Sequence, residues 1–338
     1  MVRGRPEADH QVFIFIVCIF FSLAILGCDS NRILNPEEKL EWKTYTTADG
    51  LSYNIVDDLA VDSRDRIWIA TFRGINVFDG VKWDTLNSSD GLPFEYAEVL
   101  HFDKQGNLWI GKRANGNGLI KYDGTTVTTF TTADGLSDNN IQSIASQDDG
   151  TIWVGTFYGG VCRYDGIKWV CFDTQYVNHR TVYSIYVEND RSIWFSTADG
   201  VTHYDGLKWT KYLRRFETEP NPLGYYYFKQ IHSIGFDRLY VGWFGFNYGV
   251  YKYEYGVFKI IKFDDYEYVT VNDVSVDSLS GVWFTTYSRG IYYYRNGAWN
   301  NYTVGDGLPD NYVTSVVVDS KGVIWFGTGE GLTRLQLR

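Results

Sequence analysis

The sequence predicts an all-β fold, a seven-bladed β-propeller, and three observations support this prediction. A segment of type Ile/Leu/Val-Trp-Ile/Val/Phe-Gly/Ala/Ser/Thr recurs along the chain, at Trp68, Trp109, Trp153, Trp194, Trp283 and Trp325. Each repeat of about 42 residues contains four short strand-like runs, which is the size of one propeller blade. Aromatic residues make up 18% of the 338-residue chain, with 34 Gly and only 6 Pro. Such a composition is typical of many short strands joined by tight turns.

The gap of 89 residues between Trp194 and Trp283 is about twice the other spacings, so it holds one more repeat. We place this repeat at residues 239–242, Leu-Tyr-Val-Gly, with Tyr240 in the Trp position. Seven repeats then follow one another at intervals of 41 to 46 residues.

Within a repeat, the strands can be assigned in chain order. The first strand is apolar and ends near an acidic residue, at Asp62, Asp103, Glu188, Asp277 or Asp319. The second carries the repeat Trp, and the third ends in Tyr/Phe-Asp-Gly, at residues 78–80, 122–124, 164–166 and 204–206. The fourth opens with Trp83, Trp169, Trp209 or Trp299, and Asp-Gly-Leu segments follow at residues 49–51, 90–92, 134–136 and 306–308. The Asp-Gly pairs supply the positive φ angles that tight hairpin turns require.

The two ends of the chain predict how the ring closes. The last repeat reaches Arg338 after its third strand, and a matching fourth strand stands at residues 42–47, Trp-Lys-Thr-Tyr-Thr-Thr. We expect this N-terminal strand to complete the last blade, because pairing removes a free sheet edge. The propeller would then be one domain over residues 41–338.

The first 27 residues are predicted to be a signal peptide. An apolar run from Val12 to Leu26, interrupted only by Ser22, follows Arg3 and Arg5 and is short for a membrane span. It ends in Ile-Leu-Gly-Cys, which resembles the lipobox of bacterial lipoproteins and implies lipidation of Cys28. Residues 28–40 would form a polar tether. This predicts a protein lipid-anchored in the cell envelope, with its propeller in the periplasm or at the cell surface. The alternative is an ordinary secretory signal.

The repeat unit is similar to the two-component-regulator propeller repeat. The best copy is Asp-Gly-Leu-Pro-Asp-Asn at residues 306–311, continuing to Gly-Val-Ile-Trp-Phe-Gly-Thr at residues 322–328. The resemblance implies a fold found in periplasmic sensor regions of hybrid two-component systems, many of which respond to carbohydrates. This chain has fewer repeats than those sensors, so we expect the fold and a tendency to bind ligands to transfer, rather than direct signalling.

Charge and motifs narrow the function. The net charge of −10 argues against nucleic-acid binding, which needs clustered positive charge. No Gly-x-Ser-x-Gly, His-Glu-x-x-His or Cys-x-x-Cys motif occurs. We predict a monomeric, non-catalytic protein without metal or cofactor. It would bind a small molecule, a glycan or an envelope protein, and the carbohydrate preference comes from the resemblance. A protein-interaction scaffold is the first alternative.

A metal-dependent lyase is the second alternative. The streptogramin B lyases are seven-bladed propellers with similar repeats, and they place His residues on successive blades near a metal. Here the ring position that follows His232 is Asn272, which departs from that pattern.

Loops on one face of a propeller are free to vary, so we expect the binding residues there. The predicted loops between second and third strands carry Phe72 with Arg73, Lys112 with Arg113, Phe157 with Tyr158, and Tyr287 with Arg289. Aromatic faces beside planar guanidinium groups suit polar, ring-shaped or anionic ligands.

Trp243 is the one Trp of the propeller outside the repeat positions in this assignment. It falls in an aromatic, Gly-rich segment, residues 242–249, together with Phe246. We expect either an exposed stacking platform or packing against a neighbouring long loop. The longest insertion, residues 214–228, would lie on the same face.

A ring of polar residues is predicted where the first strands begin. The residues eleven positions before the repeat Trp are Asp57, Glu98, Gln142, Tyr183, Asn272 and Thr314. If Asp237 of the fifth repeat is aligned with Asp62 of the first, His232 takes the position of Asp57 and becomes the seventh residue of the ring. Asp57, Glu98 and His232 could hold a ligand on the propeller axis, or the ring could be polar only because it is hydrated.

Cys162 and Cys171 are predicted to form a disulfide. If Tyr164 pairs with Trp169 across the hairpin, the two Cys residues face each other, at a separation that a disulfide can bridge. An exported protein meets an oxidising compartment. The alternative is two free thiols.

Overall fold

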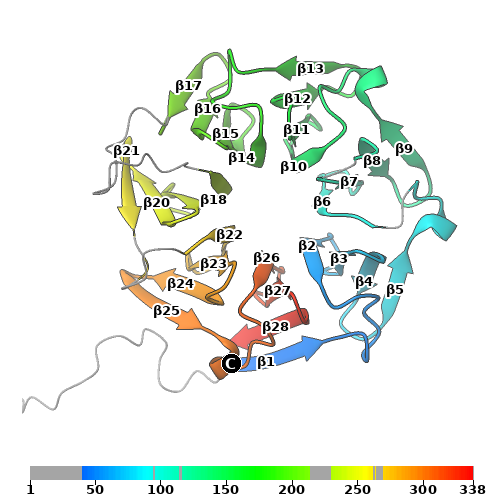
Figure 1. Ribbon diagram of the computed structural model, residues 1–338, viewed down its shortest axis with the longest axis vertical. Coiled ribbons are helices and arrows are strands. Elements are labelled where there is room, and N and C mark those ends of the chain that lie inside the picture. The colour runs from blue at the N-terminus through cyan, green and yellow to red at the C-terminus, as the bar shows by residue number, and fades with distance from the viewer. Residues whose placement is uncertain are drawn as a thin grey trace, which may run out of the picture. The chain divides into compact units, whose positions relative to one another are not determined.

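The computed structural model describes residues 40–93, 96–113, 116–213, 230–261, 263 and 269–337. The predicted signal peptide, Cys28, the tether up to residue 39 and the insertion at 214–228 lie outside these ranges. The described residues form seven antiparallel four-stranded sheets around one axis (Figure 1). The predicted seven-bladed propeller is therefore confirmed. No helix capable of crossing a bilayer occurs in the ranges given above.

Each blade presents one strand to the axis and one to the outside (Figure 1). The first, innermost strands are β2 (Val56–Val61), β6 (Val99–Phe102), β10 (Ile141–Ser146), β14 (Val182–Asn189), β18 (Ile231–Phe236), β22 (Val271–Val276) and β26 (Val313–Val318). The second are β3 (Ile67–Thr71), β7 (Leu108–Gly111), β11 (Ile152–Thr156), β15 (Ser192–Thr197), β19 (Gly242–Phe246), β23 (Val282–Thr286) and β27 (Ile324–Thr328).

The outer half of each blade follows in the same order. The third strands are β4 (Gly74–Phe78), β8 (Leu119–Tyr122), β12 (Val161–Tyr164), β16 (Gly200–Tyr204), β20 (Gly249–Glu254), β24 (Ile291–Arg295) and β28 (Gly331–Leu337). The fourth are β5 (Trp83–Leu86), β9 (Val127–Phe130), β13 (Trp169–Phe172), β17 (Trp209–Tyr212), β21 (Val257–Ile261), β25 (Ala298–Tyr302) and β1 (Leu40–Tyr45). Blades are numbered 1 to 7 from β2.

The N-terminal strand closes the ring as predicted. β1 pairs antiparallel with β28, from Leu40 opposite Leu337 to Tyr45 opposite Leu332. The strand begins two residues earlier than the sequence suggests, at the last residue assigned to the tether. Blade 7 is thus built from both ends of the propeller.

An acceptor side chain holds the repeat Trp in every blade. The indole Nε1 donates to the side chain six residues earlier, over distances of 2.6 to 3.4 Å; the acceptors are Asp62, Asp103, Gln147, Glu188, Asp237, Asp277 and Asp319. Most of these side chains also accept N–H groups of the turn that follows, as Asp62 does from Arg64 and Arg66. One side chain therefore shapes the turn between first and second strands and orients the buried ring.

This bond shows that our assignment of blade 5 is wrong. Trp243 lies in β19, and its indole N–H donates a hydrogen bond to Asp237. Its side chain is 1% exposed, so Trp243 is the repeat Trp. Phe246 is buried too, and its ring stacks on Tyr251 at 4.6 Å. Tyr240, which we placed in the Trp position, is a turn residue with φ of 59° and 73% exposure. The expected exposed stacking platform does not exist, because β19 is the second strand of blade 5 and its side chains are buried against the neighbouring blades.

The Asp-Gly-Leu segments adopt a different turn from the hairpin that we expected. The segment at residues 49–51 ends a hydrogen-bonded turn. The other three end short 3₁₀ turns between blades: η1 (Ser88–Asp90), η2 (Thr132–Asp134) and η4 (Val304–Asp306). In each, the Asp side chain caps the turn and the following Gly takes a positive φ. The Leu then packs in the core, as Leu92, Leu136 and Leu308 show at 4% exposure. The Tyr/Phe-Asp-Gly segments do form the outer hairpins, with Gly80 at φ of 94°.

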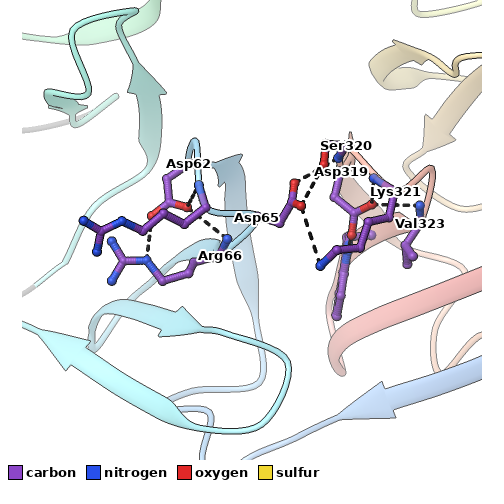
Figure 2. Close-up of polar contacts among 9 residues, drawn as sticks. Asp62, Asp65, Arg66, Asp319, Ser320, Lys321 and Val323 are labelled. Atoms are coloured by element: carbon purple, nitrogen blue, oxygen red, sulfur yellow. Dashed lines mark hydrogen bonds and ion pairs between the residues drawn. The ribbon is translucent and has the colours of Figure 1, made fainter.

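Turns between first and second strands also join neighbouring blades. Asp65 of blade 1 accepts hydrogen bonds from the backbone and hydroxyl of Ser320 in blade 7, at 3.0 and 2.7 Å, and lies 3.6 Å from the Lys321 amine (Figure 2). Lys104 of blade 2 pairs with Asp148 of blade 3 in the same way. These contacts are exposed and contribute little individually, but they fix the spacing of blades on this side.

The predicted disulfide is present. Cys162 and Cys171 lie opposite each other in β12 and β13, and their sulfur atoms are 1.98 Å apart. The bond ties the outer hairpin of blade 3.

Candidate functional site

The loops expected to bind ligand share one face, which we call the upper face. It carries the loops between second and third strands and those that enter the first strands, because antiparallel strands bring these ends together. The first strands of blades 1, 3, 4, 5, 6 and 7 start with a β-bulge, and the extra residue is Asp57, Gln142, Tyr183, His232, Asn272 or Thr314. A bulge re-aims its side chain out of the sheet, so the predicted polar ring has a structural cause.

Five residues gather where blades 6, 7, 1 and 2 meet the axis; we call them the mouth cluster. They are Asp57, Glu98, Arg113, Tyr287 and Tyr312. The Arg113 backbone N–H donates to Glu98 at 2.8 Å, and the Tyr287 and Tyr312 rings pack edge-to-face at 5.2 Å. Asp57 lies close enough to Arg113, Glu98 and Tyr312 to interact with each electrostatically. Four of the five are predicted residues, and Tyr312 is new.

Burial makes the mouth cluster sensitive to pH. Desolvation raises the pKa of Asp57 from 3.8 to about 6; nearby Arg113 opposes the shift, while Glu98 and Asp58 add to it. The pKa of Tyr312 is also raised, mainly by burial and then by the charge of Asp57. A carboxyl with a pKa near 6 accepts hydrogen bonds at neutral pH and becomes a donor when the pH falls below about 6.

A second layer of carboxylates lies directly beneath the mouth cluster. Asp58 accepts the Leu100 N–H of blade 2 at 2.9 Å and the Ser315 hydroxyl of blade 7 at 3.0 Å. Asp273 of blade 6 accepts the Ser233 hydroxyl at 2.9 Å and lies 3.3 Å from that of Ser315. Burial raises the pKa of Asp58 to about 6 and raises that of Asp273. The hydrogen bonds of Asp58 and Asp273 join five blades near the axis, so we assign these two carboxyl groups a structural role.

An aromatic row lies beside the mouth cluster on blades 1 and 2. Phe72, which is 59% exposed, stacks on Tyr96 at 5.0 Å and contacts Tyr53 at 6.2 Å. Cations lie over both ends: the Arg73 guanidinium is 5.6 Å from the Tyr53 ring, and the Lys112 amine is 3.7 Å from the Tyr96 ring. Lys112 directly precedes Arg113 in the chain, so the row and the cluster are neighbours on the upper face.

The other predicted residues lie elsewhere. His232 hydrogen-bonds the Asn247 side chain and lies 5.1 Å from the Tyr183 ring; its strand β18 is across the ring from β2 and β6 (Figure 1). Burial lowers the pKa of His232. Tyr158 of blade 3 is 65% exposed and packs against Phe157. Arg289 is exposed and shares a loop with Tyr287. Trp243 and Phe246 belong to the core.

Three tyrosines of this face escaped the sequence analysis. Tyr53, Tyr96 and Tyr312 stand in loops that enter first strands, shortly before the polar-ring residues Asp57, Glu98 and Thr314. Tyr96 and Tyr312 lie two residues before the ring position and Tyr53 lies four before it, so an alignment of the repeats signals only the first two.

Sequence comparison matches residues 135–158 and 307–330 to a repeat described as the two component regulator propeller. Each match starts at the Gly of an Asp-Gly-Leu segment and runs through a Trp-bearing second strand. Blades 3 and 7 thus contain segments similar to this repeat. A search of curated protein sequences finds no match.

Solved structures with this propeller come from proteins of several kinds. The extracellular domain of a hybrid two component system from B. thetaiotaomicron superposes with a TM-score of 0.72 at 19% identity, over 88% of this chain and 40% of that one. Virginiamycin B lyase from Staphylococcus aureus gives 0.71 at 16% identity, over 89% and 100%. PorZ, a surface component of the type-IX secretion system of Porphyromonas gingivalis, gives 0.64 at 18% identity, over 85% and 47%.

These likenesses show a shared propeller fold. This chain spans about two fifths of the length of the sensor ectodomains that it matches.

The residues present do not fit a lyase-type metal centre. Within the described parts of the chain, no three His, Cys, Asp or Glu side chains are grouped so that they could hold a metal ion. His232 contacts an amide and a phenol ring instead.

Proposed function

We propose that this protein is a non-catalytic binding protein of the bacterial cell envelope whose ligand is a carbohydrate. The observation that carries the proposal is the neighbouring position of the aromatic row and the mouth cluster on the upper face. Its exposed ring, Phe72, offers a flat apolar face, and Asp57 and Arg113 offer hydrogen-bond partners beside it. Sugar rings have one apolar face and a rim of hydroxyl groups, so they match such a surface.

The location in the envelope rests on the N-terminal sequence and on the extracellular neighbours. We propose that Cys28 is lipidated and that the monomeric propeller lies in the periplasm or at the cell surface. The hybrid-system neighbours are extracellular domains, and a binding propeller on a lipid anchor would sample the same compartment.

A glycan screen by thermal shift tests the proposal, because a ligand that binds only the folded state raises its melting temperature. We expect at least one neutral or acidic oligosaccharide to stabilise the wild-type propeller. Phe72→Ala should then weaken binding by on the order of 2 kcal/mol, as expected for an aromatic hot spot. Arg113→Gln should also weaken binding.

Tyr158→Ala is the matched control. Tyr158 is an exposed ring on the same face but on blade 3, away from the row and the cluster. Its replacement should leave glycan binding unchanged. Binding that is lost with Tyr158→Ala but kept with Phe72→Ala would place the site elsewhere and refute the proposal.

A further inference from the structure

The interface between blades 1 and 2 lacks aromatic rings that other blade interfaces have. In each blade, one residue among the first three of the fourth strand takes an equivalent position opposite the third strand; the seven residues are Trp42, Trp83, Val127, Trp169, Trp209, Phe258 and Trp299. Each packs into the interface with the preceding blade. Val127 of blade 2 is the aliphatic member of this set.

The interface between blades 1 and 2 also lacks the aromatic side chain that such a ring would contact. In five interfaces the ring contacts another aromatic from the preceding fourth strand, as Trp169 contacts Phe130 at 5.7 Å and Trp209 contacts Phe172 at 4.9 Å. Blade 1 has Leu86 at this position, opposite Ile75. Two ring positions in one interface are therefore occupied by smaller aliphatic side chains, which cannot fill the same volume.

The glycine of the Asp-Gly-Leu segment gives independent support for an unfilled ring position. A Cβ atom added to Gly50, Gly135 or Gly307 would meet Trp83, Trp169 or Trp42 within 2.8 to 3.3 Å. Among the described residues, no atom lies within 4 Å of a Cβ added to the equivalent Gly91, between blades 1 and 2. The position that a Trp ring covers in three other interfaces is open here.

A hollow of about 970 Å³ lies in this interface. Its apolar wall includes Trp68, Leu86, Phe102 and Tyr122, and Trp68 and Phe102 pack edge-to-face at 5.3 Å. The rest of the lining is polar and includes charged residues such as Asp62, Arg66, Asp84 and Lys104. The volume is at the upper end of the range for small-molecule sites, and the aromatic wall is the apolar part of a lining that is polar elsewhere.

We propose that this hollow binds a planar aromatic ring of indole size, which takes the place that Trp side chains hold in the equivalent interfaces. The wall supplies edge and face contacts of the type that Trp169 and Trp209 make in blades 3 and 4. The ring comes from a free aromatic compound or from an aromatic side chain, and both present the same chemistry. This site is separate from the aromatic row and mouth cluster, so it does not depend on the proposed function.

The test uses two probes, 5-fluoroindole and N-acetyl-tryptophanamide, with the disulfide-intact propeller. Binding of 5-fluoroindole is followed by ¹⁹F NMR line broadening, which the protein's own Trp residues do not obscure. N-acetyl-tryptophanamide, as a competitor, shows whether a peptide-borne ring is accepted. We expect saturable binding of at least one probe.

Val127→Trp is the decisive variant, because it restores the ring that the repeat has in other blades. It should weaken probe binding about tenfold or more, since a filled pocket leaves no surface for the probe, and it should raise the melting temperature. Thr128→Trp is the matched control: the next residue of the strand points to the opposite side of the sheet, so probe binding should be unchanged. If Val127→Trp does not fold, Leu86→Phe gives the same test from the opposite wall.

Two outcomes would overturn the proposal. One is the absence of saturable binding by either probe to the wild-type protein. The other is equal binding by wild type and by the folded ring-filling variant, because the probe would then occupy another place.

Discussion

A single side-chain hydrogen bond organises each blade at the residue scale. The acceptor six residues before the repeat Trp satisfies the indole N–H, which would otherwise be buried without a partner. In blade 3 this acceptor is Gln147 rather than a carboxylate, and the bond to Trp153 persists at 2.6 Å. The spacing and the buried ring matter more than the charge of the acceptor.

Trp243→Ala should destabilise the propeller as much as Trp153→Ala does. Both rings are 1% exposed and packed between blades, so each truncation should cost about 3–5 kcal/mol of unfolding free energy. Urea unfolding of the two variants measures this. A loss below about 1 kcal/mol for Trp243→Ala alone would contradict its place as the repeat Trp.

The position of Trp243 could have been read from the sequence. Trp243 lies six residues after Asp237 and eleven after His232, the spacings of the other repeats, although Leu-Tyr-Val-Gly at residues 239–242 resembles the repeat segment more closely. The local similarity pointed to Tyr240, which is a turn residue. The buried Trp is identified instead by the acceptor six residues before it, because its indole N–H needs a partner. Phe72, Arg113 and Asp57 were foreseen from repeat register. Their grouping with Tyr312 was not, since loop contacts between blades 7 and 1 depend on the closed ring.

Asp57→Asn should flatten the dependence of stability on pH. The folded-state pKa of about 6 exceeds the ordinary value of 3.8, so the folded protein holds this proton more tightly than the unfolded chain. The contribution of Asp57 to stability is therefore greatest below pH 4 and is lost as the pH rises through 6. Asn has no such proton.

The unfolding free energies of the wild type and of Asp57→Asn, measured by urea unfolding at pH 4.5 and at pH 7.5, test this prediction. The wild type should lose on the order of 2 kcal/mol more than Asp57→Asn over this interval. Parallel stability profiles for the two proteins would show that Asp57 is not held protonated by burial.

At the scale of elements, β1 is the strand whose partners are most distant in sequence. Its hydroxyl contact between Thr44 and Thr333, at 3.1 Å, joins residues 289 positions apart. Trp42 and Tyr45 add ring contacts with blades 6 and 1, to Tyr302 and Trp83. One strand therefore contributes to three blades.

Deletion of residues 29–47 should lower the unfolding free energy by more than about 5 kcal/mol, because two interface rings are lost and β28 becomes a free edge. Deletion of residues 29–39 is the control, since it leaves β1 in place. Thermal melting distinguishes the two. Equal melting temperatures for both deletions would refute the closing role of β1.

At the scale of the whole molecule, we expect the proposed ligand to bind without a change in the shape of the propeller. Its face is built from loops on rigid blades, and carboxylates near the axis tie blades 5, 6, 7, 1 and 2 together. Binding residues held in this way are pre-organised, which reduces the entropy lost on binding.

Replacement of Cys28 with Ser should move the protein from membranes to a soluble envelope fraction, because a lipid on this residue is the predicted anchor. Fractionation with immunodetection measures the shift. Persistent membrane association of the variant would point to an uncleaved signal segment instead.

The pairing of Leu40 with Leu337 places the two ends of the propeller next to each other, and this makes the protein suited to circular permutation. A short linker between these residues and a new opening at residues 46–55 would give a chain in which all seven blades are continuous. Every buried contact would remain. What would be lost is the closure of blade 7 by strands from the two opposite ends of the chain, which we call the interlock. The ratio of unfolding rates of the permuted and natural chains would then measure how far that interlock slows the opening of the ring.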